Sequence, residues 1–598
     1  MCKKNKKIKK NDIIYEVKIG DDTMIKTLMR SIREFKKPAI LTPLIVSIEV
    51  VLECIIPFIV SLLVTNIQNG CELSVIAIYG VILIGMAGLS LTCGALAGRY
   101  CAIASCGFAR NLRRDMFEKI QSFSFENVDN FQASSLVTRL TTDVTNVQHS
   151  FMMIIRTAIR SPFMLIFSFT MGFVMGGSIA FIFLLVIPIL GFGLFFIARK
   201  AMPLFQKVFK KYDNLNNSIQ ENVKGMRTVK SFVREDYETE KFNTAAEDVC
   251  NDFTKAERLL AWNHPIMQFC LYSVMVFILS FGSYTVITTK GLQVNVGQMS
   301  ALLTYGFQIL MSLMMISMIY VMLTMSVKSA ERICEVLNTI SNIKNPENPV
   351  MDVQDGSIDF NGVSFKYGSS KMILEDINLH IKSGETIGII GGTGSAKTTL
   401  IQLISRLYDV TDGEVLVGGV NVKDYDLEVL RNNVAVVLQK NILFSGTIKE
   451  NLRWGNKNAT DEELVEVCKL AQAHEFVSSF PKGYDSYIEQ GGANVSGGQK
   501  QRLCIARALL KKPKILISDD STSAVDTKTD ALIRRGLESY IPETTKLIIA
   551  QRVASVEHAD RIIVMNNGLI NGIGTHEELM NSNSIYREVY ESQNKVGE

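Results

Sequence analysis

The residues from Ser383 to Leu400 have the types and spacing that bind phosphate. They read SGETIGIIGGTGSAKTTL, in which an apolar strand, expected at Thr386–Ile390, runs into a glycine-rich turn and then a helix starting near Lys397. Such a turn directs successive backbone N–H groups at phosphate oxygens, and the helix dipole adds to the attraction. The Lys397 ammonium would then reach the β- and γ-phosphates of a nucleotide, and the Thr398 hydroxyl would coordinate Mg²⁺.

One position departs from the strict phosphate-loop pattern G-x-x-x-x-G-K-[ST]. Ala396 occupies the place of the second glycine. Its methyl group fits if the backbone has a negative φ there, and otherwise it introduces strain. A chance glycine-rich turn is the alternative interpretation, and the strand, turn and helix context argues against it.

A second element that could act on the same phosphates follows later in the chain. Asn494–Gln501 reads NVSGGQKQ, and Lys514–Asp519, KILISD, has the composition of a buried strand that ends in a carboxylate. Asp519 at the carboxyl end of that strand is placed to hold Mg²⁺ through water. Because the phosphate-loop sequence and this second element occur in the same chain, a chance resemblance to a phosphate-binding site is a poor explanation.

These motifs lie in the second half of the chain, and the first half has a different composition. Of the 598 residues, 47% are hydrophobic, and the charged ones avoid four long windows. A run of about 20 uncharged residues can span the ~30 Å hydrocarbon layer of a membrane. This segregation excludes a purely soluble, disordered or collagen-like protein. The windows are Leu73–Gly98, Ser161–Ala198, Pro265–Thr289 and Leu292–Val327.

The pattern predicts six membrane spans with both termini in the cytoplasm. The long connections Arg99–Arg160 and Arg199–His264 are rich in Arg and Lys, and basic loops stay inside. Both connections have helical composition, so we expect helical extensions of the spans that reverse near Ser122–Phe131 and Gly225–Tyr237. The expected spans are Ala39–Ile67, Leu73–Gly98, two within Ser161–Ala198 divided at Gly172–Gly177, Pro265–Thr289 and Val296–Val327.

Four segments are expected along the chain. A basic cytoplasmic segment, 1–37, with six lysines in Met1–Lys10, precedes a transmembrane domain, 38–330. A linker, 331–350, leads to an α/β nucleotide-binding domain, 351–598. The formal net charge of +4 is too mild to indicate a nucleic-acid partner, and the scattered cysteines suggest neither a disulfide framework nor a zinc site.

The sequence VSGGQ followed by the Lys514–Asp519 strand resembles the signature of ATP-binding cassette proteins. Over essentially the whole chain, the order of six spans and one cassette is similar to a half-transporter of the ABC exporter type. The resemblance implies a multi-domain fold, in which a six-helix all-α transmembrane domain with long cytoplasmic extensions precedes an α/β P-loop NTPase cassette. It implies ATP and Mg²⁺ as cofactors, and a second subunit whose cassette closes on this one around two ATP molecules.

The resemblance also assigns roles to individual residues. Tyr367 in FKYG matches the aromatic that stacks on adenine, and Gln439 in VVLQKN matches the glutamine that links the nucleotide to the membrane domain. Thr398, Gln439 and Asp519 would hold Mg²⁺. Ser523–Asp526 matches the loop that crosses to the other cassette. The phosphate loop would comprise Gly391, Gly392, Thr393, Gly394, Ser395, Ala396, Lys397, Thr398 and Thr399, and the signature Ser496, Gly497, Gly498 and Gln499.

Two departures fall on the catalytic positions. The residue after Asp519 is normally the Glu that polarises the attacking water, and here it is Asp520; the usual His that contacts the γ-phosphate is Gln551. An Asp carboxylate is one methylene shorter, and a misplacement of about 1 Å can cost ~100-fold in rate. The pattern resembles the degenerate-site subunit of heterodimeric bacterial multidrug exporters. A homodimer with slow ATPase activity and an ATP-gated channel-like protein are the alternatives.

The sequence offers two features that could contact a transported molecule. Glu49 and Glu53 lie four residues apart in the first span, hence on one helical face. Intramembrane carboxylates usually face a cavity or a polar partner, so they would bind a cationic amphipathic substrate or contact another helix. The methionines of Met311–Met325 offer an adaptable apolar wall or ordinary packing. These features do not distinguish lipids, drugs and hydrophobic peptides as substrates. From the six expected spans we predict a multi-pass protein of the cell membrane.

Overall fold

The structure is a computed structural model that describes residues 21–595 except residue 369 and residues 521–524. The lysine-rich Met1–Lys10 and the first two residues of Ser523–Asp526 therefore lie outside the described residues. Internal contacts divide the chain into two units. The first, which we call the helical unit, comprises residues up to Gln121 and Ala133–Thr339. The second, the α/β unit, comprises Ser122–Gln132 and the residues from Ile340 onward.

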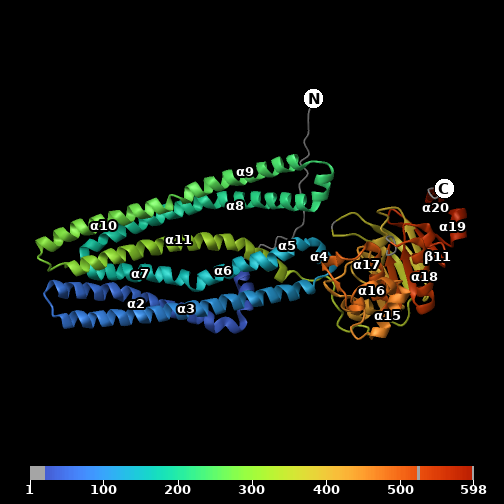
Figure 1. Ribbon diagram of the computed structural model, residues 1–598, viewed down its shortest axis with the longest axis horizontal. Coiled ribbons are helices and arrows are strands. Elements are labelled where there is room, and N and C mark those ends of the chain that lie inside the picture. Colours follow the sequence, from blue (N-terminus) through green and yellow to red (C-terminus); the bar gives the residue numbers. More distant parts are fainter. Residues whose placement is uncertain (1–20, 369, 521–524, 596–598) are drawn as a thin grey trace, which may run out of the picture. The chain divides into compact units, whose positions relative to one another are not determined.

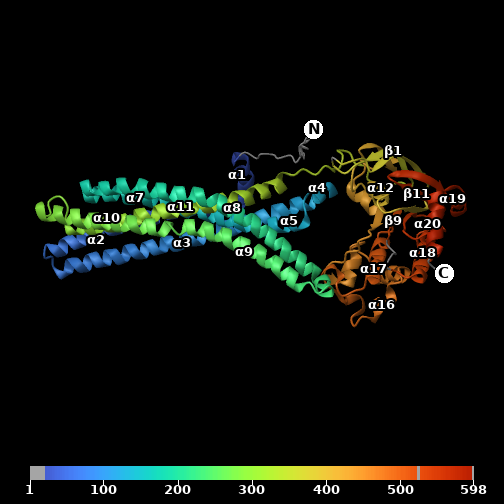
Figure 2. The ribbon, with the colours of Figure 1, turned by 90° about the horizontal axis from the view of Figure 1, so that it is seen from above.

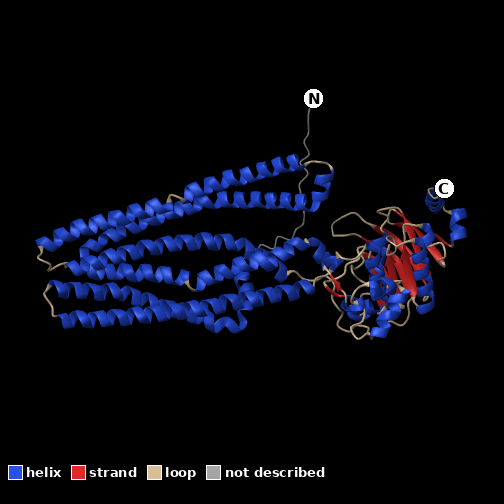
Figure 3. Ribbon diagram, viewed as in Figure 1, coloured by secondary structure: helices blue, strands red, loops and turns tan. Residues whose placement is uncertain are grey.

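The described part of the helical unit consists of helices and short connections (Figure 3). This follows from its uncharged composition, because a backbone in lipid must satisfy its hydrogen bonds within the segment. Its helices are α1 (Asp21–Met29), η1 (Arg30–Phe35), α2 (Lys36–Gln68), α3 (Leu73–Gln121), α5 (Ala133–Thr138), η2 (Arg139–Asp143), α6 (Val144–Ile155), α7 (Thr157–Gly176), η3 (Gly177–Ala180), α8 (Phe181–Ser231), α9 (Glu235–Leu260), α10 (Asn263–Thr288) and α11 (Val296–Asn338).

The long helices run well beyond the thickness of a bilayer. At 1.5 Å per residue, the 49 residues of α3 extend over about 70 Å, more than twice the hydrocarbon layer. The expected reversals are confirmed, because α3 ends at Gln121 and α8 at Ser231. In Figures 1 and 2, α2 lies beside α3 and α8 beside α9.

Five helical stretches in the described residues are long and apolar enough to cross a membrane, whereas the sequence pattern predicts six spans. The difference arises in Ala133–Ser231, which counts as one stretch although it contains both α7 and α8. Between α7 and α8 the short η3 is the element that interrupts the α-helical backbone. Gly177, with φ of 49°, begins η3, and the Phe173 ring contacts the Phe181 ring at 5.5 Å. The end of α7 thus folds back on the start of α8.

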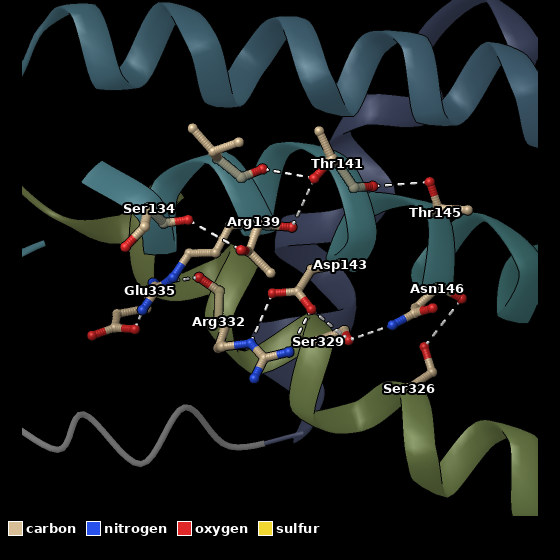
Figure 4. A network of polar contacts seen from close by, with 12 residues as sticks. Ser134, Arg139, Thr141, Asp143, Thr145, Asn146, Ser326, Ser329, Arg332 and Glu335 are labelled. Carbon is tan, nitrogen blue, oxygen red and sulfur yellow. Dashed lines mark hydrogen bonds and ion pairs between the residues drawn. The ribbon is translucent and has the colours of Figure 1, made fainter. Parts of the chain in front are cut away.

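A polar network fastens the C-terminal part of α11 to η2 and α6 (Figure 4). The Asp143 carboxylate is fully buried and accepts hydrogen bonds from Arg332 Nε at 2.7 Å and from Ser329 Oγ at 2.8 Å. Arg139 Nη1 donates to the Glu335 carboxylate at 2.7 Å and to the Arg332 carbonyl at 2.9 Å. These contacts join the two helical segments through buried polar groups, beside buried apolar residues such as Val144 and Ile333.

The described part of the α/β unit contains two larger sheets and the small two-stranded sheet β7-β8. The central sheet has the order β12-β11-β3-β10-β9-β6, parallel except for β12, and its inner strands are rich in buried Ile, Leu and Val, as is typical of a parallel sheet covered on both faces. An antiparallel sheet has the order β2-β1-β4-β5. The strands are β1 (Ile358–Phe365), β2 (Leu374–Ile381), β3 (Thr386–Gly391), β4 (Asp412–Val417), β5 (Val420–Asn421), β6 (Val434–Val437), β7 (Gly446–Thr447), β8 (Tyr487–Ile488), β9 (Ile515–Asp519), β10 (Thr545–Ile549), β11 (Arg561–Asn566) and β12 (Leu569–Gly574).

The helices of this unit are shorter, and most begin at a side-chain cap. In α15 and α17, for example, Thr460 and Ser496 cap the N-terminus in reciprocal capping boxes. The helices are α4 (Phe125–Asn130), α12 (Lys397–Ile404), α13 (Leu427–Asn433), α14 (Ile448–Arg453), α15 (Asp461–Leu470), α16 (His474–Ser479), η4 (Gly483–Asp485), η5 (Gln490–Gly492), α17 (Gly497–Leu509), α18 (Thr527–Tyr540), η6 (Val553–Ser555), α19 (His576–Ser582) and α20 (Ser584–Lys595).

Candidate functional site

Four neighbouring parallel strands bring the candidate nucleotide-binding residues together. In the central sheet β3, β10, β9 and β6 lie side by side, so the segments after them meet at one edge. The phosphate loop follows β3, and Gln551 follows β10. Asp519 is the last residue of β9 and Asp520 comes directly after it, while Gln439 follows β6. Ligands of open α/β sheets bind at this carboxyl edge.

The phosphate loop lies between β3 and α12. Lys397 Nζ donates hydrogen bonds to the carbonyls of Gly391 at 2.8 Å and Gly392 at 2.9 Å, which places the ammonium against the loop. Ala396 caps α12 with φ of 72° and ψ of 20°. The condition for an unstrained methyl group, a negative φ, is therefore not met. The left-handed conformation costs an L-residue about 1–2 kcal/mol, which glycine would not incur.

Two of the three residues expected to hold Mg²⁺, Thr398 and Asp519, contact each other, whereas the Gln439 side chain contacts Asp520. Thr398 Oγ1 donates to the Asp519 carboxylate, at 3.0 Å to Oδ2 and 3.3 Å to Oδ1. A hydroxyl and a carboxylate oxygen at this separation are the hard ligands that Mg²⁺ takes in nucleotide sites. The donor set therefore fits Mg²⁺ bound with nucleotide phosphates.

Asp520 lies at the centre of a small polar cluster. Its Oδ2 accepts a hydrogen bond from Gln551 Nε2 at 3.0 Å and another from Gln439 Nε2 at 3.4 Å. Asp520 also has a positive φ of 50°, and its N–H donates to the Ile549 carbonyl of β10 at 2.9 Å. The tertiary structure thus joins the two departing positions, Asp520 and Gln551, to the Gln439 loop.

Burial perturbs the ionisable groups of this edge. It raises the pKa of Asp519 and of Asp520, because the charged carboxylate is poorly solvated there, and the nearby Lys397 only partly offsets this. Burial lowers the pKa of Lys397, against the attraction of the two aspartates. Desolvated charges of this kind are typical of a functional site.

Tyr367 lies at the side of the phosphate loop, where an adenine ring could stack. Its hydroxyl is 3.2 Å from Thr399 Oγ1 and donates to Gln402 Oε1 at 3.1 Å, so α12 positions the ring. The ring also packs edge-on against Tyr408 at 5.1 Å. Sequence reasoning missed Tyr408, whose hydroxyl donates to Asp129 of α4. No local pattern points to this contact, since the two residues are 279 positions apart.

The signature residues form the exposed N-terminus of α17. Ser496 Oγ accepts from Gln499 N at 3.3 Å, while Gln499 Oε1 accepts from Ser496 N at 2.9 Å. Ser496 and Gly497 are exposed. Within the described residues no hydrogen bond joins the signature to the phosphate loop of the same chain, so the structure does not bring these two predicted elements together.

Glu49 and Glu53 lie in the helical unit and are paired. Arg160 Nη1 donates to Glu49 at 2.7 Å, and Arg160 Nη2 donates to both oxygens of Glu53, at 2.7 and 2.8 Å. The structure therefore shows a contact between α2 and α7, which is one of the two sequence interpretations, and the binding of a cationic substrate by these carboxylates stays a prediction. Sequence reasoning missed Arg160 because it lies 107 and 111 residues away.

Comparisons with known proteins agree with this architecture. Residues 40–314 match the family of ABC transporter transmembrane regions, and residues 374–523 match the ABC transporter family. The chain is 36% identical over 546 residues to the uncharacterized ABC transporter ATP-binding protein YfiB of Bacillus subtilis, covering 91% of this chain and 94% of that protein. It is 34% identical over 487 residues to a putative multidrug export ATP-binding/permease protein of Staphylococcus aureus, covering 81% and 84%.

A solved structure has the same fold. A bacterial Atm1-family ABC exporter with ATP bound matches 96% of this chain and 99% of its own with a TM-score of 0.79, at 21% sequence identity. The chain therefore belongs to the ABC transporter family, and it joins the transmembrane region and the ATP-binding cassette of that family in one polypeptide with the fold of an ABC exporter.

Proposed function

We propose that this chain is one half of a heterodimeric exporter of hydrophobic or amphipathic molecules. Membership of the ABC family implies ATP binding, and ATP hydrolysis coupled to transport. In the proposed complex the ATP site of this chain binds nucleotide and hydrolyses it slowly. Its VSGGQ signature completes a second, competent site on the partner subunit.

The observation that carries this proposal is the state of the Asp520 carboxylate. A general base needs a free lone pair aimed at the attacking water. Here two amides, from Gln551 and Gln439, donate to the same oxygen, Oδ2. The side chain is also one methylene shorter than Glu, which withdraws it from the water position by about 1 Å. The hydrogen bonds oppose hydrolysis through Oδ2, and the shorter side chain opposes it through either oxygen.

The signature supports the second half of the proposal. Ser496, Gly497 and Gly498 keep the types that a helix N-terminus needs to bind a γ-phosphate, and Ser496 and Gly497 are exposed at the start of α17. A chain with a weakened catalytic position and an unaltered signature is suited to a partner whose catalytic residues are complete.

The membrane arrangement follows from composition and from the family. Dividing Ala133–Ser231 at Gly177 yields six spans, with the basic helical extensions, the cassette and both termini in the cytoplasm. The relative from Staphylococcus aureus described as a putative multidrug exporter supports export from the cell membrane and a hydrophobic or amphipathic substrate. ATP with Mg²⁺, bound by Thr398, Gln439 and Asp519, supplies the energy.

Purification tests the pairing. The chain is isolated alone and, separately, from its native membrane with any subunit that accompanies it. We expect ATPase activity only from the second preparation, and mass spectrometry should identify a second ABC subunit. Comparable turnover by the chain alone would establish the slow homodimer instead, and ATP-dependent ion conductance in planar bilayers would establish the channel.

Two variants of the complex separate its two sites. Gly497→Asp places a negative charge at the signature and should reduce turnover at the partner's site by about 100-fold or more, because a γ-phosphate contact becomes repulsive. ATP photolabelling of this chain should persist. Lys397→Ala is the reciprocal variant, which should abolish photolabelling of this chain.

A further inference from the structure

The helical unit contains a cavity of about 470 Å³ between α6, α7 and α11. This volume lies within the ~300–1,000 Å³ of small-molecule sites. One wall consists of Met311 and Met315 of α11 with Phe307, and the other of Met152, Met153 and Met164. Methionine side chains adapt to ligands of irregular shape, so these walls suit an apolar chain.

The polar side of the cavity carries two arginines, Arg156 and Arg160, one turn apart where α6 gives way to α7. Arg160 is fully engaged by Glu49 and Glu53 of α2. Among the described residues that line the cavity, neither of these carboxylates occurs. Of the three charged residues Glu49, Glu53 and Arg160, the cavity is therefore lined by the arginine and by neither carboxylate.

Arg156 has a different environment. It lies at the break between the two helices, with φ of −115° and ψ of −67°, and its guanidinium reaches toward Gly98 of α3, where a Cβ would be 3.7 Å from Nη1. Within the described part of the chain, no carboxylate pairs with it. Two other polar side chains of the lining already have partners, since Gln308 accepts from Ser168 at 2.8 Å and Ser312 donates to the Gln308 carbonyl at 2.8 Å.

An unpaired guanidinium beside an apolar wall selects for one kind of ligand. A half-buried cation in an apolar segment is stabilised by an anionic partner, and guanidinium binds carboxylate through two parallel hydrogen bonds. A cation would be repelled by Arg156, and a neutral chain would leave it without a partner. The cavity volume suits a single chain.

We propose that this cavity binds a single-chain amphipathic carboxylate, with its head on Arg156 and its tail along Met311, Met315 and Met164. The proposal rests on the proposed function in one respect: the bound molecule is the one that the exporter carries. This ligand differs from the cationic substrate that Glu49 and Glu53 suggest from sequence alone, because those two carboxylates contact Arg160 and do not occur among the described residues that line the cavity.

Photolabelling without ATP tests the site directly. The full chain, with any accompanying subunit, is placed in phosphatidylcholine nanodiscs and labelled with a diazirine derivative of dodecanoate. Labels should map to residues 152–164 and 307–315. Unlabelled dodecanoate should compete, whereas dodecyltrimethylammonium and dodecanol, which share the chain length, should not. Equal competition by either compound, or labels confined to other segments, would overturn the proposal.

Variants test the role of the guanidinium. Arg156→Gln should reduce specific labelling by about tenfold, the value of a charge-assisted hydrogen-bond pair. Arg156→Lys keeps the positive charge but cannot donate two parallel hydrogen bonds to one carboxylate. It should therefore reduce specific labelling only a fewfold. The control, Arg114→Gln, removes an exposed arginine of α3 that pairs with Glu118 and should leave labelling unchanged. Unchanged labelling in Arg156→Gln contradicts the proposal, and if that variant does not fold, the competition experiment on the wild-type chain still decides.

A further arm distinguishes the source of the anion. Phosphatidylglycerol added to the nanodisc supplies an anionic lipid headgroup with two chains. If it displaces the probe as well as dodecanoate does, the occupant is a membrane lipid and the proposal is wrong. Because labelling needs no turnover, failure of ATP-driven transport in proteoliposomes would contradict the proposed function while leaving the site standing.

Discussion

The side-chain amide of Gln551 donates a 3.0 Å hydrogen bond to Oδ2 of Asp520, so the two residues that depart from the expected family pattern contact each other. In the sequence they are separate departures from the family pattern, 31 residues apart. The structure unites them because β9 and β10 are parallel neighbours, with Asp519 opposite Ile549. A change at one position therefore alters the hydrogen bonding of the other.

Restoring both catalytic positions should activate this chain's own site. We expect Asp520→Glu combined with Gln551→His to raise hydrolysis there by up to ~100-fold, because the carboxylate moves back toward the water. In the wild-type complex, one of the two nucleotides trapped after a single turnover should remain ATP; in the double variant both should be ADP. Asp520→Asn, which cannot accept a proton, is the control and should retain ATP. Retained ATP in the double variant would show that Asp520 and Gln551 are not the cause.

Replacing Ala396 by glycine should stabilise the cassette. The alanine holds a φ of 72°, and glycine removes this strain at some cost in unfolded-chain entropy, so the net gain is about 1 kcal/mol. The measurement is the thermal unfolding midpoint of the cassette transition. Ala508→Gly, in the last turn of α17, introduces glycine at a helical position where alanine has negative φ, so this control should lower the same midpoint. A lower midpoint for both variants would mean that the loop tolerates the methyl group without strain.

Acid should weaken the cassette through Glu385. Arg561 donates to its two carboxylate oxygens at 2.5 and 2.8 Å, and this contact holds the pKa of Glu385 below the ordinary value. Since the folded pKa is depressed, the stabilisation is complete above the unfolded value of about 4.3 and is lost as pH falls through the folded pKa. The unfolding midpoint of Glu385→Gln should therefore depend less on pH below about pH 5 than that of the wild type. Glu375→Gln removes an exposed carboxylate and should keep the wild-type slope.

The network of Figure 4 makes a stability prediction for the helical unit. Arg332→Met removes the guanidinium donor from the fully buried Asp143 carboxylate, to which Ser329 still donates, and should lower the free energy of unfolding by about 1–3 kcal/mol. The double variant Asp143→Asn with Arg332→Met removes the uncompensated charge and should recover part of that loss. Hydrogen exchange of α6 and of the C-terminal part of α11 reports the change. Equal protection in all three proteins would show that apolar packing alone holds these helices together.

Much of the cassette could be predicted from sequence because its signals are local. The phosphate loop, the Lys514–Asp519 strand and the VSGGQ helix start each lie within a few residues, where backbone geometry and residue type are directly linked. The capping box of Ser496 and Gln499 is of the same kind. The uncharged windows likewise predicted spanning helices, although the count of six depends on a turn at Gly177 that helix length alone does not reveal.

The sequence by itself determined which residues can bind phosphate and which segments can enter a membrane, because both properties depend on neighbours along the chain. Only the tertiary structure decided what the charged groups face. Arg160 reaches Glu49 and Glu53 across 111 and 107 residues, Gln551 reaches Asp520 across parallel strands, and Arg156 is left against the methionine-lined cavity. The interaction of two charges depends on their distance in space and on their burial, and neither quantity is set by their separation in sequence.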